Sequence, residues 1–387
     1  MLLITIFYAP AINGREYTSS IILLFVFLYF ILRYGFLKTS VTRYFLIYIM
    51  LISIMDSIQV FNAHNLTIFS SFRGIIYNFI PLIAFLVGAK FAKRKLSITL
   101  FDLIMFLIGL TQSIIGILQV YNYSIQQRTL ELYSDFEKYN NFFEEMDQGR
   151  VVGTLGNPNY FGEFIGWFIL MILFYYLPKY RTFGYRLVLI SSLFIVTYGM
   201  ILSQSRTSFI LVFIGILVML LSNVKKYKLL STMLIGIITF VLVIYANDII
   251  SVARGGWESF SSFGGRLGIW NSIITNYIYP FKWELIFGYG SHFVKSFIEE
   301  PHNYYLQILL ENGLIGIIGY LFLLSIFVYK TLKTKNTNIK TFLLVTLVTL
   351  LLSDMTSELS THIKLGSFFY IILGFGIVYR DHENIHR

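Results

Sequence analysis

Long apolar runs separated by short polar connections dominate the chain from residue 18 onward. A membrane-spanning helix needs roughly 20 mostly apolar residues. We therefore predict about eleven spans, near residues 18–37, 43–62, 72–91, 98–120, 160–178, 186–205, 207–223, 228–246, 303–329, 339–358 and 364–380. The pattern predicts an all-α, polytopic transmembrane bundle. Met1–Ile12 is too short to cross alone, leaving open a twelfth span or a re-entrant piece, and it does not look like a signal peptide.

The same pattern divides the chain into five stretches. They are N-terminal spans at 1–120, a first long loop at 121–160, central spans at 160–246, a second long loop at 247–302, and C-terminal spans with a short tail at 303–387. Loops of this length are usually functional or disordered, and the aromatic residues in both favour order. The sequence shows no internal repeat.

Short basic clusters fall on alternate connections between the predicted spans. They lie at 33–43, 90–95, 179–186, 225–228 and 330–340. Lys and Arg gather in cytoplasmic loops. The clusters therefore predict a cytoplasmic C-terminus, two long loops on the outer face and, with eleven spans, an outer N-terminus.

Composition excludes several classes of function. Of the 387 residues, 56% are hydrophobic and 13% are charged, against about 25% charged in soluble domains. The net charge of +10 is explained better by cytoplasmic loops than by nucleic-acid binding. Without cysteine the chain forms no disulfide and no thiolate metal site. It also lacks a P-loop and the common hydrolase motifs, so energy for any reaction must arrive in the substrate.

Two polar strings lie at predicted outer ends of spans. The first runs from Arg150 through Asn157-Pro158-Asn159, where the asparagines suit capping of the next helix, or binding of a sugar together with Arg150. The second is Ser203–Ser208, which contains Arg206. Arg206 is either an interfacial arginine that reaches water or part of a polar niche.

The second long loop carries a third string, Gly264-Gly265-Arg266 followed by Trp270. Flexible backbone before an arginine lets the guanidinium meet a phosphate, although a loop arginine is usually just solvated.

The fourth string, Pro301–Gly319, opens with His302 and Asn303 and contains Glu311 deeper in the predicted span. Histidine is suited to proton transfer near neutral pH. Small residues at a three-residue spacing predict one face for close helix packing. They are Gly313, Gly316 and Gly319.

Two acidic clusters raise the question of a metal site. They are Glu144, Glu145 and Asp147, and Glu299 with Glu300. Neither has the spacing of a known metal-binding loop, so we interpret both as solvated surfaces and predict no metal and no cofactor.

Together and in this order, the four strings resemble the O-antigen ligase and polymerase family of bacterial envelope glycan assembly. The resemblance runs from about Arg150 to Tyr329, and PHNYYLQILLENGLIGIIG is its specific part. The resemblance implies a membrane glycosyltransferase, similar in architecture to the GT-C class, in the bacterial cytoplasmic membrane with its active site on the periplasmic or extracellular side.

The resemblance also implies a reaction and site residues. Its donor is a glycan on undecaprenyl pyrophosphate, and its acceptor is a sugar hydroxyl, without a metal. The essential histidine falls on His302 and the two essential arginines fall on Arg206 and Arg266. Supporting substrate-binding candidates are Arg150, Asn157, Asn159, Trp270, Asn303 and Glu311. A chain-length regulator and a flippase are candidate protein partners.

Several functions remain open at this stage. We favour a polymerase of O-antigen or capsule over a ligase that transfers finished glycan to lipid A core or another acceptor. A transporter or flippase fits less well, because the sequence shows no two related halves and few deep charges. Those charges are Asp56, Asp102, Glu163, Glu311, Asp354 and Glu358. A purely structural partner would not need Arg206, Arg266 and His302.

Overall fold

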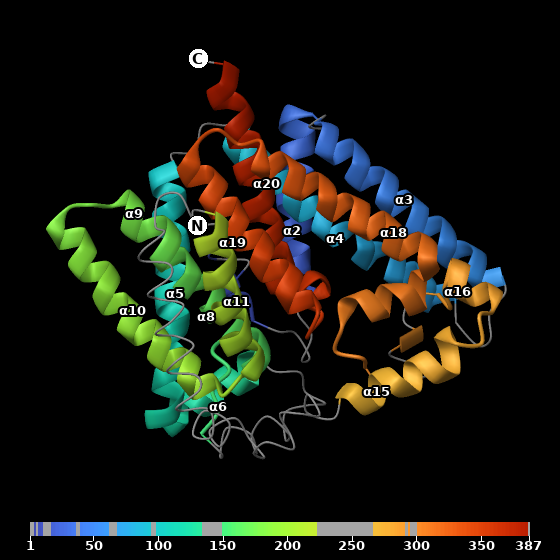
Figure 1. Cartoon of the computed structure of the whole chain (residues 1–387), viewed down its shortest axis with the longest axis horizontal. Coiled ribbons are helices and arrows are strands. Elements are labelled where there is room, and N and C mark those ends of the chain that lie inside the picture. Colours follow the sequence, from blue (N-terminus) through green and yellow to red (C-terminus); the bar gives the residue numbers. More distant parts are fainter. Residues whose placement is uncertain are drawn as a thin grey trace. The chain divides into compact units, whose positions relative to one another are not determined.

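The computed structural model describes residues 4, 7–10, 17–35, 39–61, 68–93, 98–133, 149–222, 266–290, 293–294 and 300–385. Over these ranges the chain forms helices and no strands (Figure 1). The predicted all-α architecture is thereby confirmed. The predicted span at 228–246 lies outside the described residues, and each other predicted span overlaps a helix.

Five helices of the described chain are long and apolar enough to cross a membrane. They are Ile98–Tyr121, Pro158–Lys179, Phe183–Ser203, Tyr304–Leu332 and Thr337–Asp354. Shorter apolar helices occur at Thr18–Arg33, Ser40–Met55, Arg206–Leu221 and Ile363–Tyr379. The protein is a multi-pass membrane protein, while the count of eleven spans and the likeness to the GT-C class stay predictions.

The chain divides into two compact units, each made of segments distant in sequence. Unit 1 comprises Met1–Ile22, Lys95–Phe260 and Lys335–Ser353, and unit 2 comprises Leu23–Arg94, Ser261–Thr334 and Asp354–Arg387.

Unit 1 is built around a buried helix, α8 (Pro158–Met171), in which almost every residue is inaccessible to solvent. Around α8 pack α5 (Ile98–Tyr121), α10 (Phe183–Ser203) and α11 (Arg206–Ser222). The indole of Trp167 in α8 donates to the hydroxyl of Thr346 at 3.4 Å, which joins α8 to α19 (Thr337–Asp354). A short helix, α6 (Tyr123–Tyr133), continues from α5 and forms the start of the first long loop.

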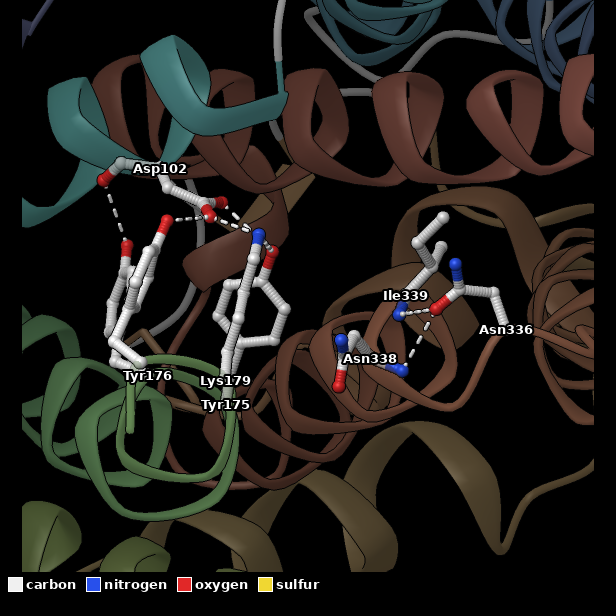
Figure 2. Close-up of polar contacts among 8 residues, drawn as sticks. Asp102, Tyr175, Tyr176, Lys179, Asn336, Asn338 and Ile339 are labelled. Carbon is white, nitrogen blue, oxygen red and sulfur yellow. Dashed lines mark hydrogen bonds and ion pairs between the residues drawn. The ribbon is translucent and has the colours of Figure 1, made fainter. Parts of the chain in front are cut away.

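A buried carboxylate, Asp102, joins α5 to the end of the α8 segment (Figure 2). It forms an ion pair with Lys179 and accepts hydrogen bonds from the hydroxyls of Tyr175 and Tyr180, both at 2.9 Å. The hydroxyl of Tyr176 donates to the Asp102 carbonyl at 3.1 Å. Between α8 and α9 (Leu177–Lys179) the chain forms a π-helix, η2 (Ile172–Tyr176). Tyr175 and Tyr176 are its last two residues, and both contact Asp102. Because Asp102 is paired, its charge is compatible with an apolar surrounding.

Unit 2 contains α2 (Tyr17–Tyr34) from Leu23 onward, α3 (Ser40–Phe61), α4 (Ile68–Lys93) and α20 (Ile363–Ile385). Two of these helices, α4 and α20, pack with their backbones in contact. A Cβ added at Gly88 would lie 2.0 Å from the carbonyl oxygen of Ile371, and one added at Gly374 would lie 2.0 Å from that of Phe85. Glycine on both helices therefore lets the two backbones touch, as is common in membrane proteins.

The longest helix of the described chain, α18 (Tyr304–Leu332), packs against α3 and breaks at one residue. Gly313 has φ 68° and ψ −170°, so the chain leaves the helical conformation there and resumes it afterward. The predicted glycine face is therefore wrong in part. Gly313 meets Ile286 of α16 and Gly319 meets Tyr48 of α3, while a Cβ at Gly316 would meet Asn312 of its own helix.

Candidate functional site

In unit 1, the loop before α8 is held by two buried glutamines of α5. The Gln119 side-chain oxygen accepts the backbone N–H groups of Val152 and Gly153 at 3.1 and 2.9 Å, and its amide donates to the Gly153 carbonyl at 2.9 Å. Two turns earlier on the same face of α5, Gln112 accepts from the Thr154 N–H at 3.1 Å and donates to its hydroxyl at 2.6 Å. The loop is buried, and a helix of the bundle satisfies these polar groups.

Asn157 and Asn159, both predicted as caps or sugar-binding residues, make different contacts. Asn157 caps α8, because its side-chain oxygen accepts the N–H groups of Asn159 and Tyr160 at 2.8 and 3.4 Å. The predicted cap at Asn157 is therefore confirmed. Asn159 does not cap the helix; its side-chain oxygen accepts from the Arg150 guanidinium at 3.4 Å.

Arg150 joins this loop to the turn that contains the second string. Its Nε donates to the Ser203 carbonyl at 3.1 Å, and the neighbouring Val151 N–H donates to the Leu202 carbonyl at 3.2 Å. The turn passes close to α8, where a Cβ at Gly162 would lie 2.7 Å from Ser205. The structure thus brings together the Arg150–Asn159 string and the Ser203–Ser208 string. Arg206, half-buried, is the first residue of α11 in that turn.

In unit 2, His302 lies immediately before α18 and its side chain is exposed. Its φ of 47° places the backbone in the left-handed region, which is uncommon for a residue other than glycine. The next residue, Asn303, caps α18 by accepting the Leu306 N–H at 3.1 Å. The helix start is therefore fixed directly after a strained, accessible histidine.

A hydrogen bond joins the third and fourth strings within unit 2. The indole Nε1 of Trp270 donates to the Pro301 carbonyl at 2.7 Å. Trp270 lies on α15 (Arg266–Ile273), whose first residue is Arg266. Residues four apart lie on one side of a helix. Arg266 is therefore one turn away from Trp270, which is bonded to Pro301, the residue before His302.

The chain after α15 returns to the break in α18. It runs through η3 (Ile274–Ile278) and α16 (Trp283–Phe287), and then the N–H groups of Tyr289 and Gly290 donate to the Leu310 and Glu311 carbonyls at 2.7 and 2.9 Å. Those carbonyls precede Gly313, where the regular helical pattern stops. Burial, with a smaller effect of the Glu284 carboxylate, raises the pKa of the Tyr289 hydroxyl above its usual value.

Glu311, half-buried, accepts the side-chain amide of Gln307 at 3.2 Å. It lies just before the break in α18 and next to the segment that follows α16. Its predicted role in substrate binding stays a prediction.

A polar cluster that the sequence motifs did not reveal lies in the same unit. The buried carboxylate of Asp354 accepts from the Tyr320 and Ser360 hydroxyls at 2.7 and 2.6 Å and from the Ser360 N–H at 2.9 Å. The connection that Asp354 begins also accepts the Tyr304 N–H at the Ser357 carbonyl, at 3.2 Å. The α19–α20 connection is therefore held against α18 at two places, by Asp354 at Tyr320 and by Ser357 at Tyr304, the first residue of the helix. The sequence signal was a deep carboxylate, without any indication of its partners.

Several predicted residues fall outside the described chain. They are Gly264, Gly265, Glu144, Glu145, Asp147 and Glu299. Within the described ranges, His, Asp and Glu side chains form no group of three that could hold a metal ion.

The family model described as O-antigen ligase matches residues 190–321. This match confirms the resemblance to the O-antigen ligase and polymerase family. It covers about a third of the chain and includes Arg206, Arg266, Trp270 and His302, while the Arg150–Asn159 string precedes it. No curated protein matches the chain.

The family match supports a general function and a general substrate class. Ligase- or polymerase-like glycan transfer is supported, with a lipid-linked oligosaccharide and an acceptor as substrates. It does not separate a ligase from a polymerase.

Proposed function

We propose that this protein is a polymerase of a surface polysaccharide, O-antigen or capsule, acting at the outer face of the bacterial cytoplasmic membrane. It transfers a glycan from undecaprenyl pyrophosphate to an acceptor sugar hydroxyl. The observation that carries the proposal is the Trp270–Pro301 hydrogen bond, because it joins the helix that begins at Arg266 to the residue before His302. An accessible base and a guanidinium in one unit are the two groups that this transfer needs.

In the proposed reaction, His302 accepts the proton of the acceptor hydroxyl. The hydroxyl oxygen attacks the anomeric carbon of the donor, and the bond from that carbon to the phosphate oxygen breaks. The pyrophosphate leaves with the electron pair, and Arg266 stabilises its charge. With no carboxylate nucleophile among the candidates, a single displacement with inversion is the simplest course. Cleavage of the sugar–pyrophosphate bond supplies the energy.

The residues of unit 1 have separate proposed roles. Arg206 binds a phosphate of the donor, as the resemblance implies. Arg150 and Asn159 orient the loop next to the Ser203–Arg206 turn, and the contacts of Arg150 with Ser203 and with Asn159 support this role.

A ligase is the second candidate, favoured by the description of the matching family model. It would transfer finished glycan to lipid A core or another acceptor through the same groups. Glycans accumulating in a strain without the protein distinguish the two. Single repeat units on the acceptor indicate loss of a polymerase, whereas long glycan retained on the lipid carrier indicates loss of a ligase.

The site itself is tested by substitution. His302→Ala should slow transfer by about 10²–10⁴-fold, the usual contribution of a general base. Arg266→Ala should slow transfer by about 10²–10³-fold. Arg266→Lys should keep only part of the transfer rate, because lysine lacks the planar guanidinium that binds a phosphate through two hydrogen bonds. The measurement is transfer by purified protein in lipid, with His382→Ala and Arg181→Ala as matched controls.

Full activity of His302→Ala would contradict the mechanism, provided that its level in the membrane equals that of the unsubstituted protein. Activity lost to EDTA and restored by Mg²⁺ would contradict the metal-independent course.

A further inference from the structure

The length of α18 exceeds what a membrane crossing requires. Its 29 residues extend about 43 Å at 1.5 Å per residue, whereas the hydrocarbon core of a bilayer is about 30 Å thick. The break at Gly313 divides the helix into Tyr304–Asn312 and Leu314–Leu332. The second piece, Leu314–Leu332, has a length within the roughly 17–25 residues of membrane-spanning helices and is therefore long enough to cross the core.

The polarity of the two pieces agrees with this division. Tyr304–Asn312 contains Gln307 and Glu311, and Leu314–Leu332 is apolar up to Lys330 in its last turn. The break at Gly313 therefore lies near one boundary of the hydrocarbon core, and Lys330 lies near the other.

The segment before Gly290 is fixed against this break. A Cβ at Gly313 would lie 2.2 Å from the Ile286 carbonyl oxygen, and one at Gly288 would lie 2.1 Å from that of Glu311. No side chain fits at either position, so the end of α16 touches the α18 backbone directly. In Figure 1, α16 lies beside α18. The depth of the break is thus also the depth of α16.

At the start of α16, three large aromatic side chains are exposed within five residues. Their exposed fractions are 84% for Tyr279, 68% for Phe281 and 73% for Trp283. Lys282 between them is exposed as well, and Phe281 has a left-handed backbone with φ 45°. Exposed aromatic surface of this kind marks an interaction site. Tyr and Trp are the residues enriched at the boundary between lipid and water.

We propose that Tyr279, Phe281 and Trp283 form a lipid anchor that inserts into the headgroup boundary of the bilayer. The occupant is the phospholipid leaflet, because the break in α18 sets the depth of α16 at that boundary and because aromatic rings beside a lysine suit acyl chains beneath phosphate groups. The anchor holds α15, and with it Trp270 and Pro301, at the membrane surface. It is a lipid contact and stands without the transfer reaction.

The absence of cysteine makes a clean test available. Phe281→Cys carries a nitroxide spin label in the full chain reconstituted in phospholipid vesicles. Collision rates are measured with oxygen, which concentrates in lipid, and with a neutral nickel chelate, which stays in water. Ser272→Cys, exposed on α15, is the control expected in water, and Ile318→Cys, exposed on α18, is the control expected in lipid.

The label at 281 should favour oxygen over the nickel chelate, as at 318, and the label at 272 should show the reverse. Tyr279→Cys repeats the measurement in case Phe281→Cys does not fold. A label at both 279 and 281 that behaves as the one at 272 overturns the proposal. A label shielded from both reagents also overturns it, because it indicates a protein contact instead of lipid.

Discussion

Two segments of this protein precede membrane helices in the same way and differ in how they are held. The loop ending at Asn157 and the segment ending at Asn303 each finish in an asparagine that caps the next helix. In unit 1 the loop is buried, and the glutamines of α5 bind its backbone. In unit 2, His302 is exposed with a left-handed backbone. The first arrangement holds its loop rigidly, and the second leaves a side chain accessible, as the proposed role of His302 requires.

The largest effect on stability should come from Gln119→Leu. The substitution leaves the buried N–H groups of Val152 and Gly153 without their acceptor, at about 1–3 kcal/mol each. We expect the free energy of unfolding to fall by about 3 kcal/mol or more, measured by denaturation in mixed micelles. Gln127→Leu is the matched control, because Gln127 is exposed and its side-chain amide donates to the side chain of Glu131. Its free energy of unfolding should change by no more than about 0.5 kcal/mol. Equal losses in the two variants would refute a rigid support in unit 1.

Trp270→Phe should act on transfer more than on stability. It keeps an aromatic ring and removes the indole N–H that donates to the Pro301 carbonyl. A hydrogen bond of this kind contributes about 1 kcal/mol, so the expected loss is about fivefold to tenfold in transfer rate. The assay uses purified protein with lipid-linked donor, and Trp167→Phe, which likewise removes an indole donor but lies in unit 1, is the matched control. An unchanged rate in Trp270→Phe would show that the bond does not position His302.

The smallest expected effects come from the two helix caps. Asn157→Ala and Asn303→Ala should each lower the free energy of unfolding by about 1 kcal/mol, since each removes the acceptor of a helix N-terminus. Only Asn303→Ala should also slow transfer, because it loosens the start of α18 directly after His302. Transfer slowed equally in Asn157→Ala would mean that the loop of unit 1 contacts substrate.

The sequence predicted the helices well because hydrophobic length is a local property. It also predicted the cap at Asn157, since an asparagine before proline is a local signal. It missed the Gln112 and Gln119 contacts, because a glutamine inside an apolar run indicates a polar partner but not which one.

The break in α18 was missed for a related reason. Gly313, Gly316 and Gly319 repeat at the spacing of a packing face, and only the approach of the 286–288 backbone shows that Gly313 leaves the helix. The bond from Trp270 to Pro301 joins positions 31 residues apart. Such pairings depend on tertiary structure, which the sequence alone does not show.

The ion pair of Asp102 has a consequence for how the protein is made. Lys179 is 77 residues later in the chain than its partner. At about 5–20 residues per second, the ribosome adds it some 4–15 seconds after Asp102. During that interval α5 lacks the cation and tyrosines that neutralise and bind its carboxylate. The pairing of Asp102 can therefore form only after Lys179 has been synthesised, so α5 reaches its final contacts together with the end of the α8–α9 segment.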